Sequence, residues 1–223
     1  LCEVLKQETS IRVKSIFSHL AGSDSETFDD FSNLQIASFE RMAAKIEAKI
    51  GYSTIRHICN SGAITRFKAA HYEMVRLGIG MYGIGFNDLE KQHLKNISSL
   101  KTRISQIRIL KKGETVGYNR RGMAEQDMTI ATIPIGYADG LSRRTGNGNF
   151  SVYIHGTACK TIGNICMDMC MIDVSGLNCA EGDEVIVFET NRQLMALSEA
   201  MDTIPYEVLT NISTRVKRVY VQE

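Results

Sequence analysis

Four polar residues in the first third of the chain stand at or near the ends of short apolar runs: His19, Asn60, Ser61 and Arg76. Side chains at the C-terminal ends of parallel strands form the reactive face of α/β barrels. An imidazole, a hydroxyl and a guanidinium gathered there could bind an anion or take part in acid–base chemistry. We therefore expect these residues to belong to one site.

Two segments could bind a phosphate. Asn60-Ser61-Gly62 lies between a strand-like run and a short helix, so it offers a hydroxyl, free amide groups and the positive end of the helix dipole. In Arg76-Leu77-Gly78-Ile79-Gly80 the glycines allow the backbone N–H groups to approach an anion closely. The local alternatives are a plain helix cap at Asn60 and a surface arginine at Arg76, and neither segment alone excludes its alternative.

The second half of the chain holds further candidates. Tyr118 stands just before two arginines, and a tyrosine, whose pKa is ordinarily about 10, acts as a base only where nearby cations favour the phenolate. Tyr137 lies where a strand leads into an Asp-Gly turn, and Met167 precedes Asp168 in an apolar run. Taken singly, Tyr118 has a structural interpretation and Met167 that of a core residue.

The elements that must position the first group follow an alternating pattern. Strand-like runs occupy residues 12–17, 54–59 and 73–79. Between the first two, a capping-box spacing at Ser23 and Glu26 begins an amphipathic helix that stops at Gly51. Strands that alternate with helices in this order predict parallel βα units.

The alternation of predicted strands and helices stops after about residue 85. Residues 86–96 are polar and uneven, as in a linker. Short β-rich runs separated by turn glycines follow at residues 102–110, 129–135, 150–155, 165–174, 184–188 and 216–221. Together with two short helices over 193–201 and 206–212, these runs predict an antiparallel sheet or barrel. We therefore expect two domains, residues 1–97 and 98–223.

Composition excludes several classes of partner. The chain has 26 basic and 25 acidic residues, so nothing favours nucleic acid or an anionic membrane. No apolar run approaches the roughly 20 residues of a membrane span, and no signal peptide opens the chain. Six cysteines without a second Cys/His pair predict free thiols in the cytoplasm rather than disulfides or a metal site.

Six segments in this order together resemble the alanine racemase family: Ser18-His19-Leu20-Ala21, Cys59-Asn60-Ser61, Val75 to Gly83, Val116-Gly117-Tyr118, Pro134 to Gly140 and Ile165-Cys166-Met167-Asp168. The last four are long or distinctive, and all six stand in register across the whole chain. The resemblance favours the functional interpretation of each local motif over its structural alternative.

The resemblance implies an α/β part plus an all-β part: the C-terminal portion of a (β/α)8 TIM barrel that binds pyridoxal 5'-phosphate (PLP), followed by a mainly antiparallel β domain. Such enzymes are cytoplasmic isomerases that interconvert L-alanine and D-alanine, supplying D-alanine for peptidoglycan in the cell wall. PLP is held on a Schiff-base lysine and acts as an electron sink. The family forms head-to-tail homodimers in which each active site contains residues of both chains.

The resemblance also implies individual roles. Tyr118, reaching in from the partner chain, would be one of two catalytic bases, linked through His19 to Arg76. Arg76 would face the pyridine nitrogen and leave it unprotonated, which limits side reactions. The phosphate would be held by Ser61, with Asn60 beside it, and by the backbone of Gly78 and Ile79. The residues expected to meet or admit the substrate are Tyr137, Met167 through its backbone, and Asp168.

The chain departs from the family pattern in two places. Thr214 stands where members often have a phosphate-binding tyrosine, so its contact with the cofactor phosphate is in doubt. No segment matches the Ala-x-Val-Lys-Ala-x-Ala-Tyr-Gly type that carries the Schiff-base lysine. We expect the chain by itself to be an inactive part of the enzyme, with the early barrel strands absent.

Three alternatives remain open at this point. The isolated chain could be a cofactor-phosphate-binding or dimerisation portion without chemistry of its own. The parent could act on another amino acid such as serine or lysine, although the bulk of Tyr137 and Met167 argues against large side chains. Finally, some members of the family are fused behind a cell-wall ligase, and this chain is compatible with such a fusion.

Overall fold

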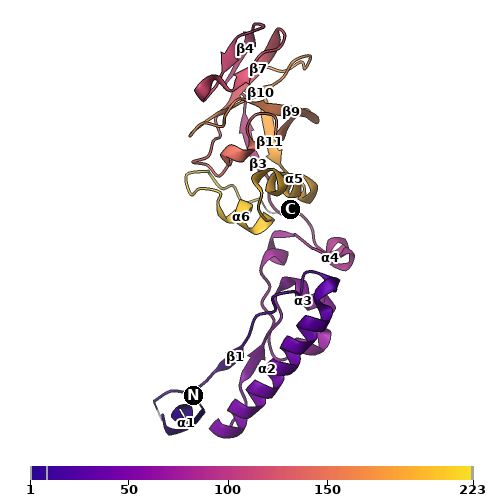
Figure 1. Ribbon diagram of the computed structural model, residues 1–223, viewed down its shortest axis with the longest axis vertical. Coiled ribbons are helices and arrows are strands. Elements are labelled where there is room, and N and C mark those ends of the chain that lie inside the picture. Colours follow the sequence, from indigo (N-terminus) through magenta and orange to yellow (C-terminus); the bar gives the residue numbers. More distant parts are fainter. Residues whose placement is uncertain (1, 9, 222–223) are drawn as a thin grey trace. The chain divides into compact units, whose positions relative to one another are not determined.

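The computed structural model describes residues 2–8 and 10–221 (Figure 1). It divides into two compact units, Leu1–Ile97 and Ser98–Glu223. The first unit is α/β, and the second is a curled antiparallel sheet with two helices. This confirms the predicted fold class.

The first unit is built on two parallel strands. β1 (Ser15–Phe17) pairs with β2 (Ile55–His57), and α2 (Asp29–Ile50) is the crossover that joins them. The helix buries Phe39 and Ala43, which stand four residues apart on one face as the amphipathic spacing requires. It ends at Gly51, whose φ of 82° is left-handed. Leu20, Ile58 and Cys59 complete the core around Phe39.

Smaller elements surround this βα unit. They are α1 (Cys2–Gln7), the 3-10 turn η1 (Glu26–Phe28), α3 (Ser61–Arg66), the turns η2 (Lys68–Ala70) and η3 (Ile79–Tyr82), and α4 (Asp88–His93). Figure 1 shows α2 lying alongside β1. β2 leads through Asn60 directly into α3, so the carboxyl end of this strand lies next to the start of that helix.

Three sequence predictions for the first unit are corrected. Residues 73–79 form no strand: the Arg76 amide donates to the Cys59 carbonyl at 2.9 Å, and the chain then turns at Gly78 into η3. The expected linker contains α4, which carries a full capping box from Asn87 and Glu90. The predicted cap Ser23 instead donates to Asn60 Oδ1 at 2.7 Å, while Ser25 caps η1.

The second unit is a seven-stranded sheet in the order β3-β11-β8-β9-β10-β7-β4, antiparallel at each pairing. The strands are β3 (Leu100–Arg103), β4 (Gln106–Leu110), β7 (Met128–Ile133), β8 (Ser151–Ile154), β9 (Thr157–Ile162), β10 (Cys170–Asp173) and β11 (Glu184–Phe188). The end strands β3 and β4 are separated by only Ile104 and Ser105. Ile104 donates to Asp183 O and Ser105 to Thr132 O, so the sheet curls until this one segment closes it.

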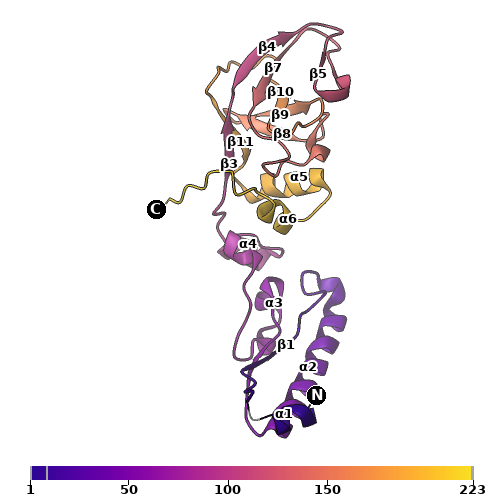
Figure 2. The ribbon, with the colours of Figure 1, turned by 90° about the vertical axis from the view of Figure 1, so that its left-hand side faces the viewer.

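Alternation along the strands fills the inside of this curled sheet. Val152 and Ile154 of β8 and Val185 and Val187 of β11 are fully buried, while Tyr153 and Ile186 between them are only partly buried. Two helices, α5 (Asn191–Met201) and α6 (Pro205–Thr210), pack at one end of the sheet, as Figure 2 shows. The remaining elements are the small hairpin β5 (Thr115–Val116) and β6 (Gly122–Met123) and the turns η4 (Tyr118–Arg120) and η5 (Arg143–Thr145).

Some predictions for the second unit are also corrected. Residues 102–110 are two strands rather than one, and 165–174 contributes only the four residues of β10, because residues 164–169 form a loop. No strand forms over 216–221, where Arg218 binds the carbonyls of the preceding turn. The sequence interpretation missed β9, whose mixture of lysine, threonine and alanine lacks a clear apolar alternation.

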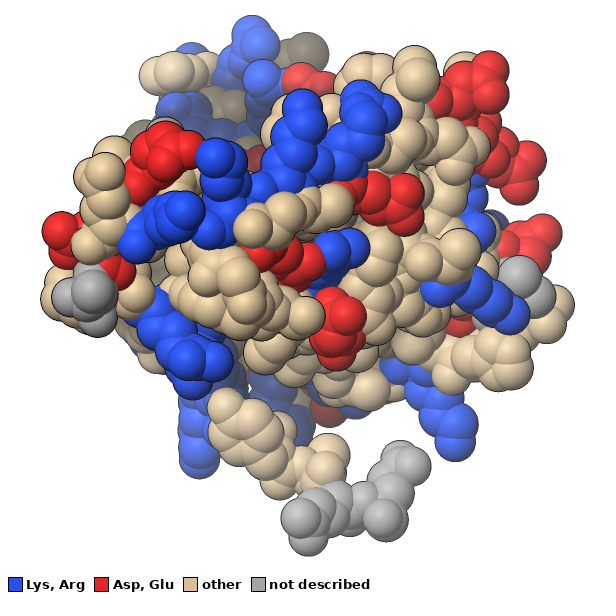
Figure 3. All heavy atoms as spheres, turned by 90° about the horizontal axis from the view of Figure 1, so that it is seen from below, with Lys and Arg blue, Asp and Glu red and all other residues tan. Residues whose placement is uncertain are grey.

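Two surface properties of the described residues bear on partners. Within residues 2–8 and 10–221, none of the helices combines the length and the apolar character needed to cross a bilayer. Lysine and arginine side chains are interspersed with aspartate and glutamate on the face drawn in Figure 3. That face therefore offers no field of a single sign to a polyanion.

Candidate active site

The first unit holds a cradle around the Ser61 hydroxyl. Asn60 caps α3 by accepting from the Ala63 amide at 3.1 Å, which places Ser61 at the first helical position. Ser61 Oγ then accepts from the amide of Gly78 at 2.8 Å and, more weakly, from that of Gly80 at 3.4 Å. Because Ser61 is buried, these bonds fix the turn after Arg76 against the start of the helix.

The donors of this cradle suit a phosphate group. The intervening Ile79 amide is buried and has no hydrogen-bond partner within the described part of the chain. A Cβ built on Gly78 would lie 3.5 Å from Ser61 Oγ, so a side chain there would occupy the cradle. A hydroxyl and convergent amides near a helix start are a common phosphate site. The cradle thus fits the phosphate of PLP by its chemistry.

Two acidic residues border the cradle. Asp24 lies so close to Gly62 that a Cβ on this glycine would overlap its carboxylate. Partial burial raises the pKa of Asp24, and the neighbouring Glu90 carboxylate raises it further. Glu90 is buried and accepts from the Thr65 hydroxyl and the Phe86 amide, each at 2.8 Å. The two carboxylates therefore limit the space that is available to an anion.

Arg76 is fixed by the carboxyl ends of both strands. Its Nη2 donates to the Ser18 carbonyl at 2.8 Å and lies 3.4 Å from His19 Nδ1. Its Nη1 lies 2.8 Å from His57 Nδ1 and donates to the His57 carbonyl at 3.2 Å. The remaining donor, Nε, has no partner among the described residues, so one N–H stays available for a ligand.

His57 is a site residue that the sequence interpretation missed. It is buried, and its ring stacks on Phe17 with the centroids 5.4 Å apart. Burial lowers the pKa of His57, and the charge of Arg76 lowers it further, so the ring is held neutral with Nδ1 as acceptor. Its position as the last residue of β2, three residues before Asn60, was the available signal.

In the second unit, Tyr118 is presented by a strained turn. Gly117, Asn119 and Arg120 all have left-handed φ angles of 53–79°. Asn164 holds the turn by donating to the Tyr118 carbonyl at 3.0 Å. The side chain is 71% exposed, and its hydroxyl has no partner among the described residues. The turn therefore projects this phenol away from its own unit.

The other predicted residues of this unit converge at two touching loops. Tyr137 donates its amide to Cys166 O at 3.1 Å, and Ala138 donates to Met167 O at 3.0 Å. Gly136 permits this approach, since a Cβ there would overlap both carbonyls. The Met167 amide has no partner within the described residues, so it remains a free donor beside Asp168.

An arginine joins these loops to the C-terminal segment. Arg215 donates to Asp139 Oδ1 at 2.7 Å and to Asp168 Oδ1 at 2.6 Å. Partial burial opposes ionisation of Asp139, but the hydrogen bonds from Arg215 and the Gly136 amide outweigh it and lower the pKa of this carboxyl. Thr214, exposed and next to Arg215, is thereby placed at the edge of the cluster.

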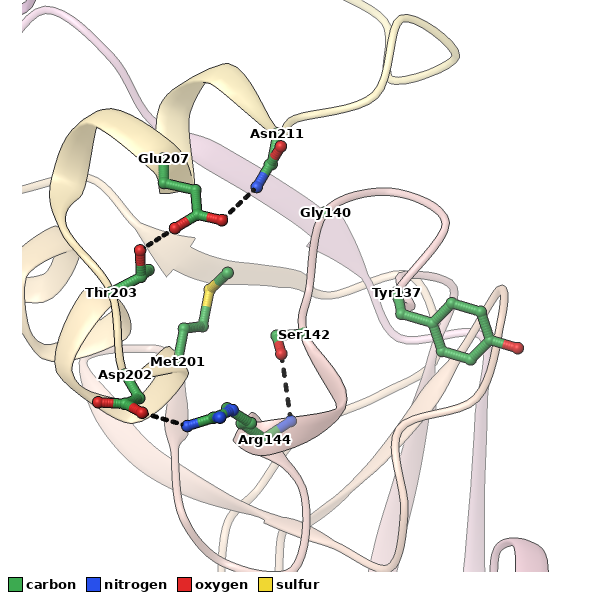
Figure 4. Close-up of a pocket in the computed structure, with 9 residues that line it drawn as sticks. All are labelled: Tyr137, Gly140, Ser142, Arg144, Met201, Asp202, Thr203, Glu207 and Asn211. Atoms are coloured by element: carbon green, nitrogen blue, oxygen red, sulfur yellow. Dashed lines mark hydrogen bonds and ion pairs between the residues drawn. The ribbon is translucent and has the colours of Figure 1, made fainter.

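The structure thus assembles the predicted residues into groups within each unit. His19, Asn60, Ser61, Arg76, Gly78 and Ile79 meet in the first, and Tyr137, Met167 and Asp168 meet in the second, with Thr214 next to Arg215 at their edge. A cavity of about 490 Å³ in the second unit adjoins the latter group, because Tyr137 is among the residues that line it. Its polar wall is engaged in pairs such as Arg144–Asp202, and the Tyr137 ring points away from it (Figure 4).

Comparison with known proteins places both units in one family. Residues 1–85 match the family model described as the alanine racemase N-terminal domain, and residues 97–220 match the alanine racemase C-terminal domain. Alanine racemase 1 of Clostridium acetobutylicum is 39% identical over 96% of this chain, and the alanine racemase of Clostridium tetani is 38% identical over 98%. The chain spans 57% and 58% of those two proteins.

Solved structures of alanine racemases also resemble this chain. An alanine racemase of Clostridium difficile superposes with a TM-score of 0.87 at 32% identity, over 98% of this chain and 58% of that one. The alanine racemase of Bartonella henselae, solved with covalently bound pyridoxal phosphate, gives a TM-score of 0.86 at 31% identity, over 98% and 60%. The fold of both units is therefore that of this group of proteins.

Proposed function

The chain belongs to the alanine racemase family, and we propose that it forms the C-terminal part of a PLP-dependent racemase that interconverts L-alanine and D-alanine. The observation that carries the proposal is the Ser61 cradle. The amides of Gly78 and Gly80 donate to its hydroxyl, and the Ile79 amide has no partner among the described residues. The cradle stands beside an arginine fixed by two strand ends. A phosphate and an aromatic nitrogen of one ligand would find matching donors there.

When bound, PLP withdraws electrons from the substrate carbon that loses its proton. Ser61 and the amides of Gly78 and Ile79 would hold its phosphate. The free Nε–H of Arg76 would donate to the pyridine nitrogen. Since an arginine keeps its own protons, this nitrogen would stay unprotonated and the electron withdrawal would be moderate. Arg76 would therefore favour proton exchange at the substrate carbon over side reactions.

Tyr118 would move the proton on one face of the alanine Cα. Its exposure and lack of a partner support a role in a site completed by a second copy, since nothing in its own unit engages the phenol. We infer a head-to-tail homodimer in which Tyr118 serves the cradle of its partner. His19, in contact with Arg76, would connect that phenol to the cofactor site.

The second unit would bind the substrate carboxylate. The free amide of Met167 is the donor, and Tyr137 and Met167 are bulky side chains at the same loops. Their bulk supports a small substrate such as alanine over lysine, with serine as the nearest competitor. We further propose that the D-alanine serves peptidoglycan synthesis and that the enzyme acts in the cytoplasm.

The test is a racemisation assay of the natural protein that contains this chain, purified with PLP and offered alanine, serine and lysine. We expect alanine to react fastest, serine less well and lysine not at all. The 223 residues alone should be inactive, because they offer no segment of the type that carries the cofactor-bearing lysine. An absence of alanine racemisation by the natural protein, with PLP bound, would overturn the proposal.

A further inference from the structure

We propose that Arg215 is a positioning residue for substrate binding: it holds together the segments that carry Tyr137, Met167 and Thr214, and it offsets the charge of Asp168 beside the free Met167 amide. The inference deepens the proposed function and rests on it. Asp139 and Asp168 are the two groups through which Arg215 acts.

The guanidinium reaches two separate loops at once. Its Nε donates to Asp139 Oδ1 at 2.7 Å, and its Nη2 donates to Asp168 Oδ1 at 2.6 Å. The Asp139 side chain is only 12% exposed, whereas those of Arg215 and Asp168 are about half exposed. One charge is thus anchored in the interior, and the other faces the solvent at the rim. Charge-assisted pairs of this kind are stronger than neutral hydrogen bonds.

Asp139 in turn accepts hydrogen bonds from the backbone amides of two different segments. Its Oδ2 accepts from the Gly136 amide at 2.8 Å, which closes the turn that carries Tyr137. Its carbonyl accepts from the Ser213 amide at 3.2 Å, which fixes the segment that carries Thr214. The two stretches are in close contact, since a Cβ on Gly140 would meet Asn211 O at 2.8 Å. Arg215 therefore completes a connection among three segments.

Arg215 also affects the charge of Asp168. This carboxylate follows Met167, whose amide is the proposed donor to the substrate carboxylate. A carboxylate bound at this amide and the Asp168 carboxylate would repel each other, and the repulsion is screened only in part at a half-exposed position. Arg215 bonds directly to Asp168 and offsets its charge. Without Arg215, the same amide would have to bind its ligand against an unpaired negative charge.

The experiment compares steady-state kinetics of the natural protein that contains this chain, loaded with PLP, and its variants. Arg215→Ala should raise KM for alanine by roughly tenfold and change kcat by less than about twofold, because the reacting groups are untouched. Adding Asp168→Asn to Arg215→Ala should recover most of the lost KM. Arg144→Ala, which breaks the exposed pair with Asp202 in the same unit, is the matched control and should behave as wild type.

Hydrogen exchange of the same variants supplies a readout apart from activity. Arg215→Ala should accelerate exchange in peptides covering 136–140, 166–169 and 211–216, and Arg144→Ala should not. Two results would overturn the proposal. One is a fall in kcat as large as the rise in KM, with no recovery of KM when Asp168→Asn is added. The other is unchanged hydrogen exchange in the three segments. If wild type itself fails to racemise alanine, the proposed function fails instead, so the two failures are distinguishable.

Discussion

At the scale of single residues, the candidate site is defined by hydrogen-bond donors that have no partner among the described residues. Ser61 Oγ gathers two amides, while Ile79 N–H, Met167 N–H and Arg76 Nε have no partner among the described residues. Buried polar groups are normally paired, so the buried amide of Ile79 is a donor available to a bound group. These free donors distinguish a binding site from a well-packed loop.

Ser61 gives the most local prediction. Ser61→Ala removes one hydrogen bond to a charged phosphate, which should weaken PLP binding roughly 10- to 100-fold. Ser61→Asp should abolish binding, because its carboxylate would repel the phosphate. The measurement is a PLP titration followed by absorbance in the natural protein. Ser25→Ala, a cap in the same unit, is the control, and equal affinities for all variants would refute the cradle.

His57 predicts a pH dependence of stability. Its folded-state pKa lies below the ordinary value of 6.5, so the folded state binds the proton less well than the unfolded chain. The associated stability is therefore complete above about pH 6.5 and is lost as the pH falls below it. His57→Asn, whose amide oxygen can take the place of Nδ1, should flatten the fall in Tm between pH 6.5 and 5. Parallel Tm curves for the two proteins would contradict this assignment.

At the scale of elements, the strand ends carry the site. β1 and β2 are only three residues each, yet both deliver carbonyls to Arg76, and α3 begins at Ser61 because Asn60 caps it. In the second unit the loops at 136–140 and 164–169 lie in contact because Gly136 has no side chain. The site is thus a property of element termini rather than of element interiors.

Gly136→Ala tests this element-scale claim. The new methyl group would overlap the carbonyls of Cys166 and Met167, so the loops must separate. We expect a loss of about 1–3 kcal/mol in stability, as for other overpacked sites, together with a raised KM for alanine. Gly113→Ala is the comparison: it is left-handed but has open space around it, so it should lower stability without altering KM. An unchanged KM in Gly136→Ala would contradict the proposed role of the loop contact.

Much of the fold and of the candidate site was predictable from sequence, and the predictions that were wrong or missing have physical causes. The amphipathic helix ending at Gly51 follows from spacing and a stop residue, and β11 from an uninterrupted apolar run. Residues 73–79 were expected as a strand, but only tertiary pairing decides whether an extended apolar segment joins a ladder. His57 and the Arg215 cluster depend on contacts between residues that are 19 or more positions apart, which no local pattern reveals.

At the scale of the whole molecule, the proposed active site is shared. Tyr118 serves a partner's cradle if the homodimer is as proposed, so complementary defects should cancel in a mixed dimer. Combining Ser61→Asp and Tyr118→Phe subunits by unfolding and refolding should restore about one quarter of wild-type activity, because half the dimers are mixed and one of their two sites is intact. No recovery would place Tyr118 in the site of its own chain.

The central claim is that Tyr118 is a base of an alanine racemase, and its most direct test is the racemisation rate of the Tyr118→Phe variant of the natural protein that contains this chain. Loss of a positioned acid–base group should lower kcat by roughly 10²- to 10⁴-fold while PLP stays bound. Tyr220→Phe, at a tyrosine that is also exposed and has no assigned role, should be indistinguishable from wild type. Full activity in Tyr118→Phe would contradict the account.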